Sequence, residues 1–201
     1  MSRQQIIEAI GGRDFDALVP RDFLDHFGLV RPGQYGVVCA DVGAAINSLE
    51  GLGATPFVHV RTNAPGWTEW GEKKKVGVEM AMGYSDGEQI EILGAGHNTQ
   101  LYSQTIPADG SIALHHVCCM QNNLAELKQI LPAAGYPLAV EGASNLGIIS
   151  TRFAYFDTRK ELGFWLEIGQ YRLFGRHRPP SEALITRLAR LQRRFAAKDK
   201  G

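Results

Sequence analysis

The sequence predicts an α+β fold in which two β-α-β-β-β modules pair into a curved mixed sheet around one site, with extra helices at both ends. An internal repeat supports this prediction, because residues 34–53 correspond in pattern to residues 116–135. Each copy reads as a strand, a helix that ends at a glycine, and three further strands. Neither copy is long enough to close a hydrophobic core alone, so we expect the two to form one domain.

The chain divides into five parts on this interpretation. The two modules are joined by a linker, an N-terminal helical extension precedes them, and a C-terminal tail follows with a basic amphipathic helix. In chain order the parts are residues 1–33, 34–95, 96–112, 113–170 and 171–201.

Local signals place the elements inside each part. Asp41 is the expected N-cap of the first module's helix, and Asn123 with Glu126 three residues later resembles a capping box in the second. Each helix ends at a glycine that a proline follows within three residues, which favours entry into a strand. Short helices are expected over 4–10 and 21–27, and strands over 34–38, 55–61, 75–83, 87–92, 116–120, 138–141, 148–157 and 163–168.

The tail holds a helix signal after two prolines. Ser181 is its expected N-cap. An apolar stripe at helical spacing follows, with arginines around the other sides, and we expect this helix to pack on the domain or on a second subunit. The stripe consists of Leu184, Ile185, Leu188 and Leu191.

Composition excludes several classes of protein. The 201 residues carry 21 Lys+Arg against 21 Asp+Glu, so no net charge draws the chain to nucleic acid or an anionic membrane. No apolar run approaches the roughly 18 residues that a membrane span needs. Three cysteines, two of them adjacent, cannot form a disulfide framework, and a cytoplasmic location is expected.

The repeat brings ligand-type side chains to equivalent positions. Alternate residues of a strand share a face, so a curled sheet can bring four such positions together: Gln34, Glu91, His116 and Glu167. Carboxylates inside apolar strands are costly to bury without a partner, and a divalent cation would be one. Taken alone, Glu91 is better explained as a solvent-facing residue, and His116 as a satisfied core or surface histidine. His115 is expected on the opposite face of the same strand.

At these residues the chain resembles the vicinal oxygen chelate superfamily, which includes glyoxalase I, methylmalonyl-CoA epimerase, extradiol dioxygenases and the bleomycin and fosfomycin resistance proteins. The resemblance lies in residues 114–117 before the helix 123–134, and in residues 153–158 followed by 161–167. It extends over residues 34–170 and is weaker in the first module.

The resemblance implies one metal ligand from the first strand and one from the last strand of each module. Carried over, it gives the metal set Gln34, Glu91, His116 and Glu167. That set is similar to the glyoxalase I version, whereas epimerases usually begin with histidine. Extradiol dioxygenases use two histidines and one carboxylate, and resistance proteins that only sequester a drug lack the ligands.

The implied activity is that of a metal-dependent isomerase, epimerase or lyase. One divalent ion (Zn, Ni, Co or Mn) would polarise a chelated carbonyl and stabilise an enolate, with Glu167 as the base and Glu91 as its mirror-related catalytic partner. The implied substrate is a small molecule with a carbonyl or vicinal oxygens, for example a thioester or thiol conjugate, and the implied assembly is a homodimer. Two alternatives stay open: a non-catalytic binding or resistance protein, and an iron-dependent dioxygenase.

Aromatic residues suggest a pocket. Trp67, Trp70 and Trp165 are candidates to line it, while Met80 and Met82 are assigned to ordinary core. The lysine run at residues 73–75 is interpreted as solvated.

Overall fold

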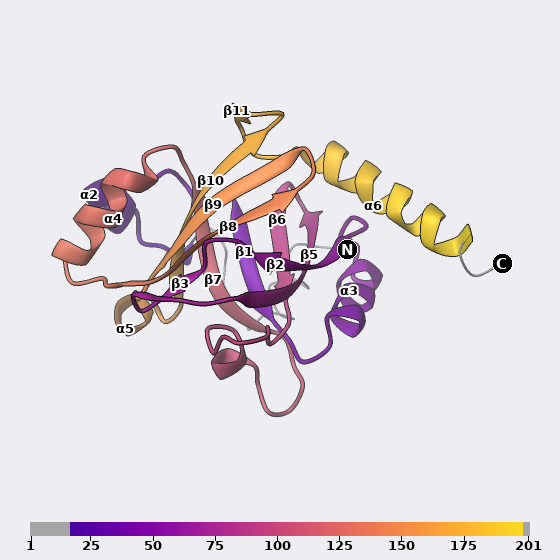
Figure 1. The fold of residues 1–201 in the computed structure, drawn as a ribbon, viewed down its shortest axis with the longest axis horizontal. Coiled ribbons are helices and arrows are strands. Elements are labelled where there is room, and N and C mark those ends of the chain that lie inside the picture. Colours follow the sequence, from indigo (N-terminus) through magenta and orange to yellow (C-terminus); the bar gives the residue numbers. More distant parts are fainter. Residues whose placement is uncertain (1–16, 199–201) are drawn as a thin grey trace.

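The computed structural model describes residues 17–198, so the helix predicted over residues 4–10 lies outside the described part. The described chain forms one large sheet with helices around it (Figure 1). The helices are α2 (Arg21–Phe27), α3 (Val42–Gly51), α4 (Leu124–Ala133), α5 (Arg159–Leu162) and α6 (Glu182–Lys198), with a 3-10 turn η2 (Ser103–Thr105). The strands are β1 (Gln34–Val38), β2 (Val58–Ala64), β3 (Thr68–Glu69), β4 (Glu72–Lys73), β5 (Val76–Ser85), β6 (Glu88–Leu93), β7 (Ala113–Met120), β8 (Leu138–Leu146), β9 (Ile149–Phe156), β10 (Trp165–Leu173) and β11 (Arg176–His177).

The strand order confirms the two-module fold. Along the sheet the order is β2-β5-β6-β1-β7-β10-β9-β8-β3-β4, with β11 paired to β10. Strand β1 pairs antiparallel with β7, and each pairs in parallel with the last strand of its own module, β6 or β10. The first strands of the two modules therefore pair with each other at the centre of the sheet. The last strands of the modules, β6 and β10, flank this pair symmetrically.

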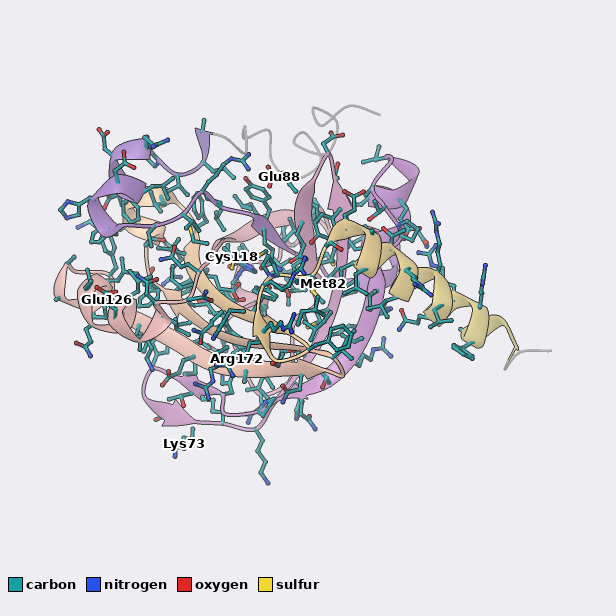
Figure 2. All side chains as sticks on the ribbon, turned by 90° about the horizontal axis from the view of Figure 1, so that it is seen from above. Lys73, Met82, Glu88, Cys118, Glu126 and Arg172 are labelled. Carbon is teal, nitrogen blue, oxygen red and sulfur yellow. The ribbon has the colours of Figure 1, made fainter. Side chains whose placement is uncertain are left out.

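The convex face of the sheet carries the main hydrophobic core. Alternate residues of the four central strands, such as Val37, Ile92, Val117 and Ile168, pack there against helices α2, α3 and α4. The intervening residues face the concave side. The period of two that the sequence predicts is thus present in β1, β6 and β10, and in β7 from His116 onward. Figure 2 shows Cys118 near the centre of the molecule.

Two capping predictions have different outcomes. Asp41 accepts a hydrogen bond from the Ala44 amide at 2.9 Å, so it caps α3 as expected. Asn123 makes no side-chain cap on α4, and the expected capping box is wrong. Its side chain instead accepts from Gln121 Nε2 at 2.6 Å and donates to Glu126 Oε2 at 3.3 Å.

The segment between β2 and β5 bridges the two edges of the sheet. Residues 62–74 lie between the strands expected over 55–61 and 75–83, and in the structure they extend β2 and then form the β3–β4 hairpin, which pairs with β8 of the second module. The Ala143 amide donates to the Pro65 carbonyl at 2.9 Å, which fixes the crossing. Trp67 in this segment is 1% exposed, so the segment covers part of the concave side of the sheet.

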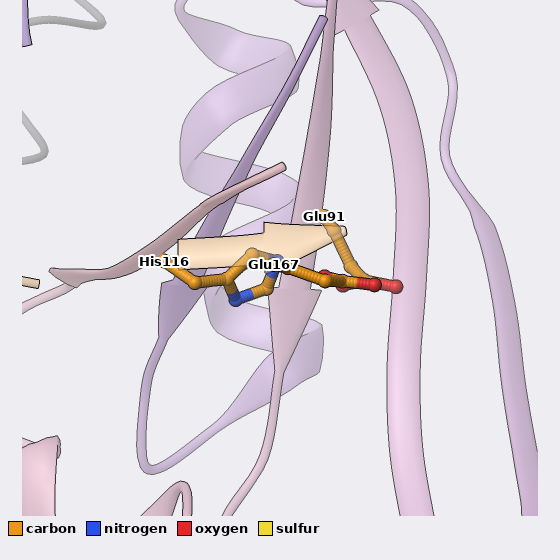
Figure 3. Close-up of side chains that lie close together, drawn as sticks. All are labelled: Glu91, His116 and Glu167. Carbon is orange, nitrogen blue, oxygen red and sulfur yellow. The ribbon is translucent and has the colours of Figure 1, made fainter. Parts of the chain in front are cut away.

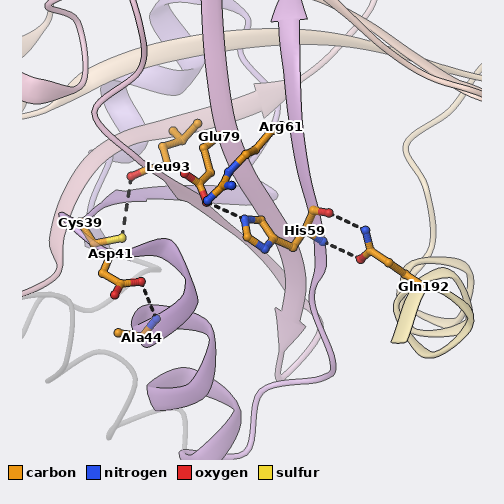
Figure 4. Close-up of polar contacts among 8 residues, drawn as sticks. All are labelled: Cys39, Asp41, Ala44, His59, Arg61, Glu79, Leu93 and Gln192. Atoms are coloured by element: carbon orange, nitrogen blue, oxygen red, sulfur yellow. Dashed lines mark hydrogen bonds and ion pairs between the residues drawn. The ribbon is translucent and has the colours of Figure 1, made fainter. Parts of the chain in front are cut away.

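Helix α6 protects the edge strand β2. Ser181 Oγ accepts from the Leu184 amide at 3.4 Å, consistent with the expected N-cap. Gln192 holds β2 through its amide: Oε1 accepts from the His59 amide at 3.0 Å and Nε2 donates to the His59 carbonyl at 2.5 Å (Figure 4). An edge strand with free backbone groups invites pairing with other chains, so this contact closes part of that edge.

The predicted apolar stripe of α6 is buried only in its first half. Ile185 and Ala189 are fully buried, whereas Leu191 is 46% exposed. No helix in residues 17–198 has the length and apolar character to cross a bilayer.

Candidate metal centre

The sheet register assembles the site from two rows across strands β6, β1, β7 and β10. Each row takes one residue from every strand, and both rows face the concave side. The first row is Glu91, Gly36, His116 and Trp165, and the second is Gln89, Gln34, Cys118 and Glu167.

Three of the four predicted metal ligands come together in this way. One ligand atom each from Glu91, His116 and Glu167 lies within 4.8 Å of the other two, and all three residues are buried. His116 Nε2 is 2.9 Å from Glu167 Oε2 and 3.4 Å from Glu91 Oε2. Figure 3 shows the imidazole and both carboxylates directed toward one another. An imidazole nitrogen and carboxylate oxygens are ligands that divalent transition metals accept.

Unpaired ligand atoms support the fit of these residues to a cation. His116 Nε2 and Glu167 Oε2 are buried 2.9 Å apart as an ion pair without hydrogen-bond geometry, and Gln34 Oε1 is buried without a hydrogen-bond partner in the described chain. A buried polar atom without a partner costs roughly 1–3 kcal/mol, so most such atoms in folded proteins are paired. Of the five such side-chain atoms in the described chain, three belong to residues that the repeat predicts as metal ligands, and the other two are Trp165 Nε1 and Thr186 Oγ1.

Gln34 lies in the second row, and its side chain is held in place by its amide nitrogen. Nε2 donates to Gln89 Oε1 at 2.7 Å and to Tyr171 Oη at 3.1 Å. These two bonds leave Oε1 free as a neutral oxygen donor. That Gln34 is the fourth ligand stays a prediction.

Charge and burial act against each other at this centre. Burial raises the pKa of the Glu91 carboxyl, and the nearby Glu167 charge raises it further, while His116 lowers it. Burial alone would lower the pKa of His116, but the two carboxylates raise it to about 9. Without a metal ion, a proton on His116 therefore supplies the positive charge that the carboxylates require.

A glycine makes room for the His116 ring. A Cβ atom on Gly36 would lie 1.7 Å from His116 Cε1 and 2.1 Å from its Nδ1. Glycine inside a strand commonly marks close approach of another group. Here the approaching group is the neighbouring imidazole, which crosses over the backbone of β1.

His115 lies beside His116 in the structure, although the sequence did not indicate it as a site residue. The expectation that it points to the opposite face is wrong, because the register between β1 and β7 shifts between Gly36 and Val37, and Leu114 pairs with Val37. This bulge leaves His115 outside the alternation. Its ring lies 5.2 Å from Tyr102, 5.9 Å from Tyr155 and 6.3 Å from Trp165.

A largely apolar cavity opens above the two carboxylates. Glu91 and Glu167 are the charged residues among the described side chains that line it. Thr62, Ser144 and Thr151 add hydroxyls, and the remaining lining residues are apolar or aromatic: Ala64, Trp67, Val78, Met80, Met82, Leu93, Tyr102, Ile149, Phe153, Tyr155 and Tyr171.

The pocket predictions are corrected in part by this lining. Trp67, Met80 and Met82 face the cavity, so the methionines are not merely core. Trp70 is 55% exposed and does not line the cavity, and Trp165 packs beside His115 instead. The segment expected to be a linker contributes Tyr102, for which neither repeat nor spacing gave a signal. Tyr155 had one, since it matches Tyr84 of the first module.

The lysine run lies away from this cavity. Figure 2 shows Lys73 at the periphery of the molecule. Lys73 and Lys75 are exposed, and Lys74 Nζ lies 3.3 Å from Glu69 Oε2. The run therefore contributes no charge to the cavity lining, in agreement with the solvated interpretation.

Comparison with known families agrees with this architecture. A family model described as the Glyoxalase/Bleomycin resistance protein/Dioxygenase superfamily matches residues 33–155, more than half of the chain. The chain belongs to this superfamily. No curated protein sequence matches it.

Solved structures of the superfamily share its fold. The Streptomyces coelicolor methylmalonyl-CoA epimerase, as a variant in complex with 2-nitronate-propionyl-CoA, superposes with a TM-score of 0.51 at 16% identity, covering 70% of this chain and 96% of that one. A methylmalonyl-CoA epimerase in complex with methylmalonyl-CoA and NH4+ gives a TM-score of 0.51 at 16% identity, with 70% and 94% covered. At this identity the likeness shows the fold alone.

Proposed function

We propose that this superfamily member is a metal-dependent lyase or isomerase that moves a proton on the carbon beside a carbonyl group. The observation that carries the proposal is the buried group of Glu91, His116 and Glu167, whose two carboxylates line an apolar cavity. Glu91, His116 and Glu167, with Gln34, would hold one divalent ion such as Zn, Ni, Co or Mn. The ion would supply Lewis acidity to a carbonyl oxygen and so stabilise the charge left when a neighbouring proton departs.

Glu167 is the proposed base. Its carboxylate lines the cavity, where it can accept a proton from a bound molecule. Glu91 lines the same cavity from the equivalent position of the other module. Two carboxylates supplied by symmetric strands suit a reaction that removes a proton at one position and returns it at another.

The cavity walls support a substrate with an apolar arm. Methionine and aromatic side chains surround the space, and no basic side chain lines it in the described chain. A second anionic group on the substrate would lack a partner there and would be costly to bury. We therefore propose a carbonyl compound with an aliphatic or aromatic substituent, for example as a thioester or thiol conjugate.

The donor set favours this reaction class over the iron dioxygenase alternative. Oxygen-activating iron sites typically use two histidines and one carboxylate. Here the described cluster holds one histidine and two carboxylates, and the second histidine, His115, is bonded elsewhere. A non-catalytic binding protein on the same fold would not require a carboxylate that can act as a base. Homodimer formation stays a prediction.

Metal titration tests the first half of the proposal. Protein freed of metal is titrated with Zn, Mn, Co and Ni, and the bound ion is counted by elemental analysis. We expect one ion per chain. Failure of every ion to bind would remove the proposed function.

Solvent deuterium exchange tests the second half. Metal-loaded protein is incubated in heavy water with thioesters of branched aliphatic and arylacetic acids and with thiohemiacetals of 2-oxoaldehydes. Proton NMR then follows exchange beside the carbonyl. For a probe that exchanges, Glu167→Gln should slow exchange at least ~100-fold with little change in probe affinity, because an amide oxygen can still ligate the ion but cannot accept a proton. Elemental analysis of the variant checks that it still binds one ion. Glu88→Gln, at the start of strand β6, is the matched control. Full activity of E167Q would remove Glu167 as the base.

A further inference from the structure

We infer that His115 is a positioning residue that fixes the hydrogen-bonded state of His116 and thereby presents His116 Nε2 to the metal centre. The inference rests on the proposed metal site for its consequence, but its geometry stands on contacts within the chain. Two hydrogen bonds define it. His115 Nδ1 is 3.1 Å from His116 Nδ1, and His115 Nε2 is 3.0 Å from the Leu101 carbonyl oxygen.

The direction of both hydrogen bonds follows from donor chemistry. A carbonyl oxygen can only accept, so His115 Nε2 must carry a proton and donate to Leu101. His115 is 1% exposed among Tyr102, Tyr155 and Trp165, and no carboxylate bonds to it in the described chain, so burial keeps its ring neutral. A neutral imidazole with a proton on Nε2 has a bare Nδ1. His115 Nδ1 is therefore an acceptor.

The proton between the two rings consequently belongs to His116. Its Nδ1 must donate, since the facing nitrogen can only accept. When His116 is neutral, this leaves the lone pair on Nε2, the atom that lies 2.9 Å from Glu167 Oε2. A metal-ligating histidine whose other nitrogen donates to a fixed acceptor is held in tautomer and in ring orientation. Leu101, His115 and His116 thus form a relay that ends at the candidate metal centre.

The β-bulge is what makes this relay possible. In a regular strand, successive side chains point to opposite faces, and the two histidine rings could not meet at their Nδ1 atoms. The register shift opposite Gly36 and Val37 turns His115 toward the concave side. Bulges of this kind often lie beside active sites, where they redirect a side chain. The predicted linker, residues 96–112, takes part in this hydrogen-bond relay because it supplies the Leu101 carbonyl.

Long-range proton–nitrogen NMR tests the inference directly. In protein with labelled histidines, with and without Zn, we expect His115 to show a bare Nδ1 and a protonated Nε2, and His116 to show a protonated Nδ1. A protonated His115 Nδ1, or a bare His116 Nδ1, would overturn the inference. This readout needs no metal, so it separates failure of the relay from failure of the proposed function.

Zn affinity of variants gives the second readout. His115→Phe keeps an aromatic ring but removes the acceptor, and it should weaken Zn binding ~10–100-fold, as loss of an outer hydrogen bond to a ligand does. His115→Asn offers an acceptor oxygen near the Nδ1 position and should restore most of the affinity. Cys119→Ala, a fully buried change on the opposite face of the same strand, is the control for general damage. Equal affinities of H115F and wild type would overturn the inference.

Discussion

Gly36→Ala is the sharpest test of the site geometry, because it adds a single methyl group to the strand that passes beneath His116. The new Cβ would lie 1.7 Å, 2.1 Å and 2.3 Å from Cε1, Nδ1 and Nε2 of the ring. Ordinary contacts to a Cβ begin near 3.4 Å. The ring must therefore retreat by roughly 1.5 Å or more, since a packed interior offers no other relief.

Such a displacement is large for a metal ligand. Metal–ligand distances are held within about 0.2 Å, so a ring that moves this far no longer ligates. We expect Zn affinity to fall by at least ~100-fold. Loss of a hydrogen-bond partner of a ligand costs up to ~100-fold in affinity, and loss of the ligand itself should cost at least as much. The stability of the metal-free protein should fall by about 1–3 kcal/mol from overpacking. The reduced chain entropy of alanine in the unfolded state would return roughly 0.4–1 kcal/mol.

Urea unfolding and Zn competition with a chelator are the assays, and two companion variants make them decisive. Gly77→Ala places a methyl in another strand where the nearest atom, His97 Cβ, is 3.4 Å away, so it should leave both quantities near wild type. In a His116→Ala background the clash is absent, so G36A should cost little stability there. Wild-type Zn affinity in G36A, or an equal stability loss in both backgrounds, would refute the reasoning.

Two further predictions follow from the site and from the sheet edge. Zn at 100 times its dissociation constant should stabilise the protein by about 2.7 kcal/mol, which is roughly 5–10 °C in melting temperature for a chain of this size, and a chelator should reverse the shift. An unchanged melting temperature would contradict a site formed only in the folded chain. Gln192→Ala should lower the free energy of unfolding by about 1 kcal/mol and speed exchange of the His59 amide, because both bonds to that backbone are lost. Arg190→Ala, an exposed change on the same helix, should do neither.

The periodicity of apolar residues in strands and helices made it possible to predict the two modules and the residues that share a face of the sheet. Alternation placed Glu91 and Glu167 on the same faces as Gln34 and His116, and the symmetry of the repeat brought them together. Periodicity is a local property that survives folding. The same applies to Asp41, whose cap depends only on the next turn of its helix.

Features that depend on contacts between distant segments could not be predicted from the periodicity of the sequence. The bulge at His115 is set by its register with β1, and a single strand carries no sign of that shift. The β3–β4 hairpin forms because β8 of the other module offers it an edge. The role of Tyr102 depends on the path of a segment without periodicity. Asn123 had a good capping pattern, but Gln121 competes for its side chain, as local polar groups often do.

The energetics of the centre argue that it is kept for its chemistry and not for stability. Burying Glu91 and Glu167 together in one cavity floor places like charges close to each other, and His116 alone must compensate both. Replacing such a cluster by apolar residues of similar volume is often neutral or stabilising in other proteins. The concave face is otherwise largely apolar, so apolar residues at the positions of Glu91, His116 and Glu167 would be compatible with it. The proposed cation would pair with Glu91, His116 and Glu167 at once and so offset the cost of burying them.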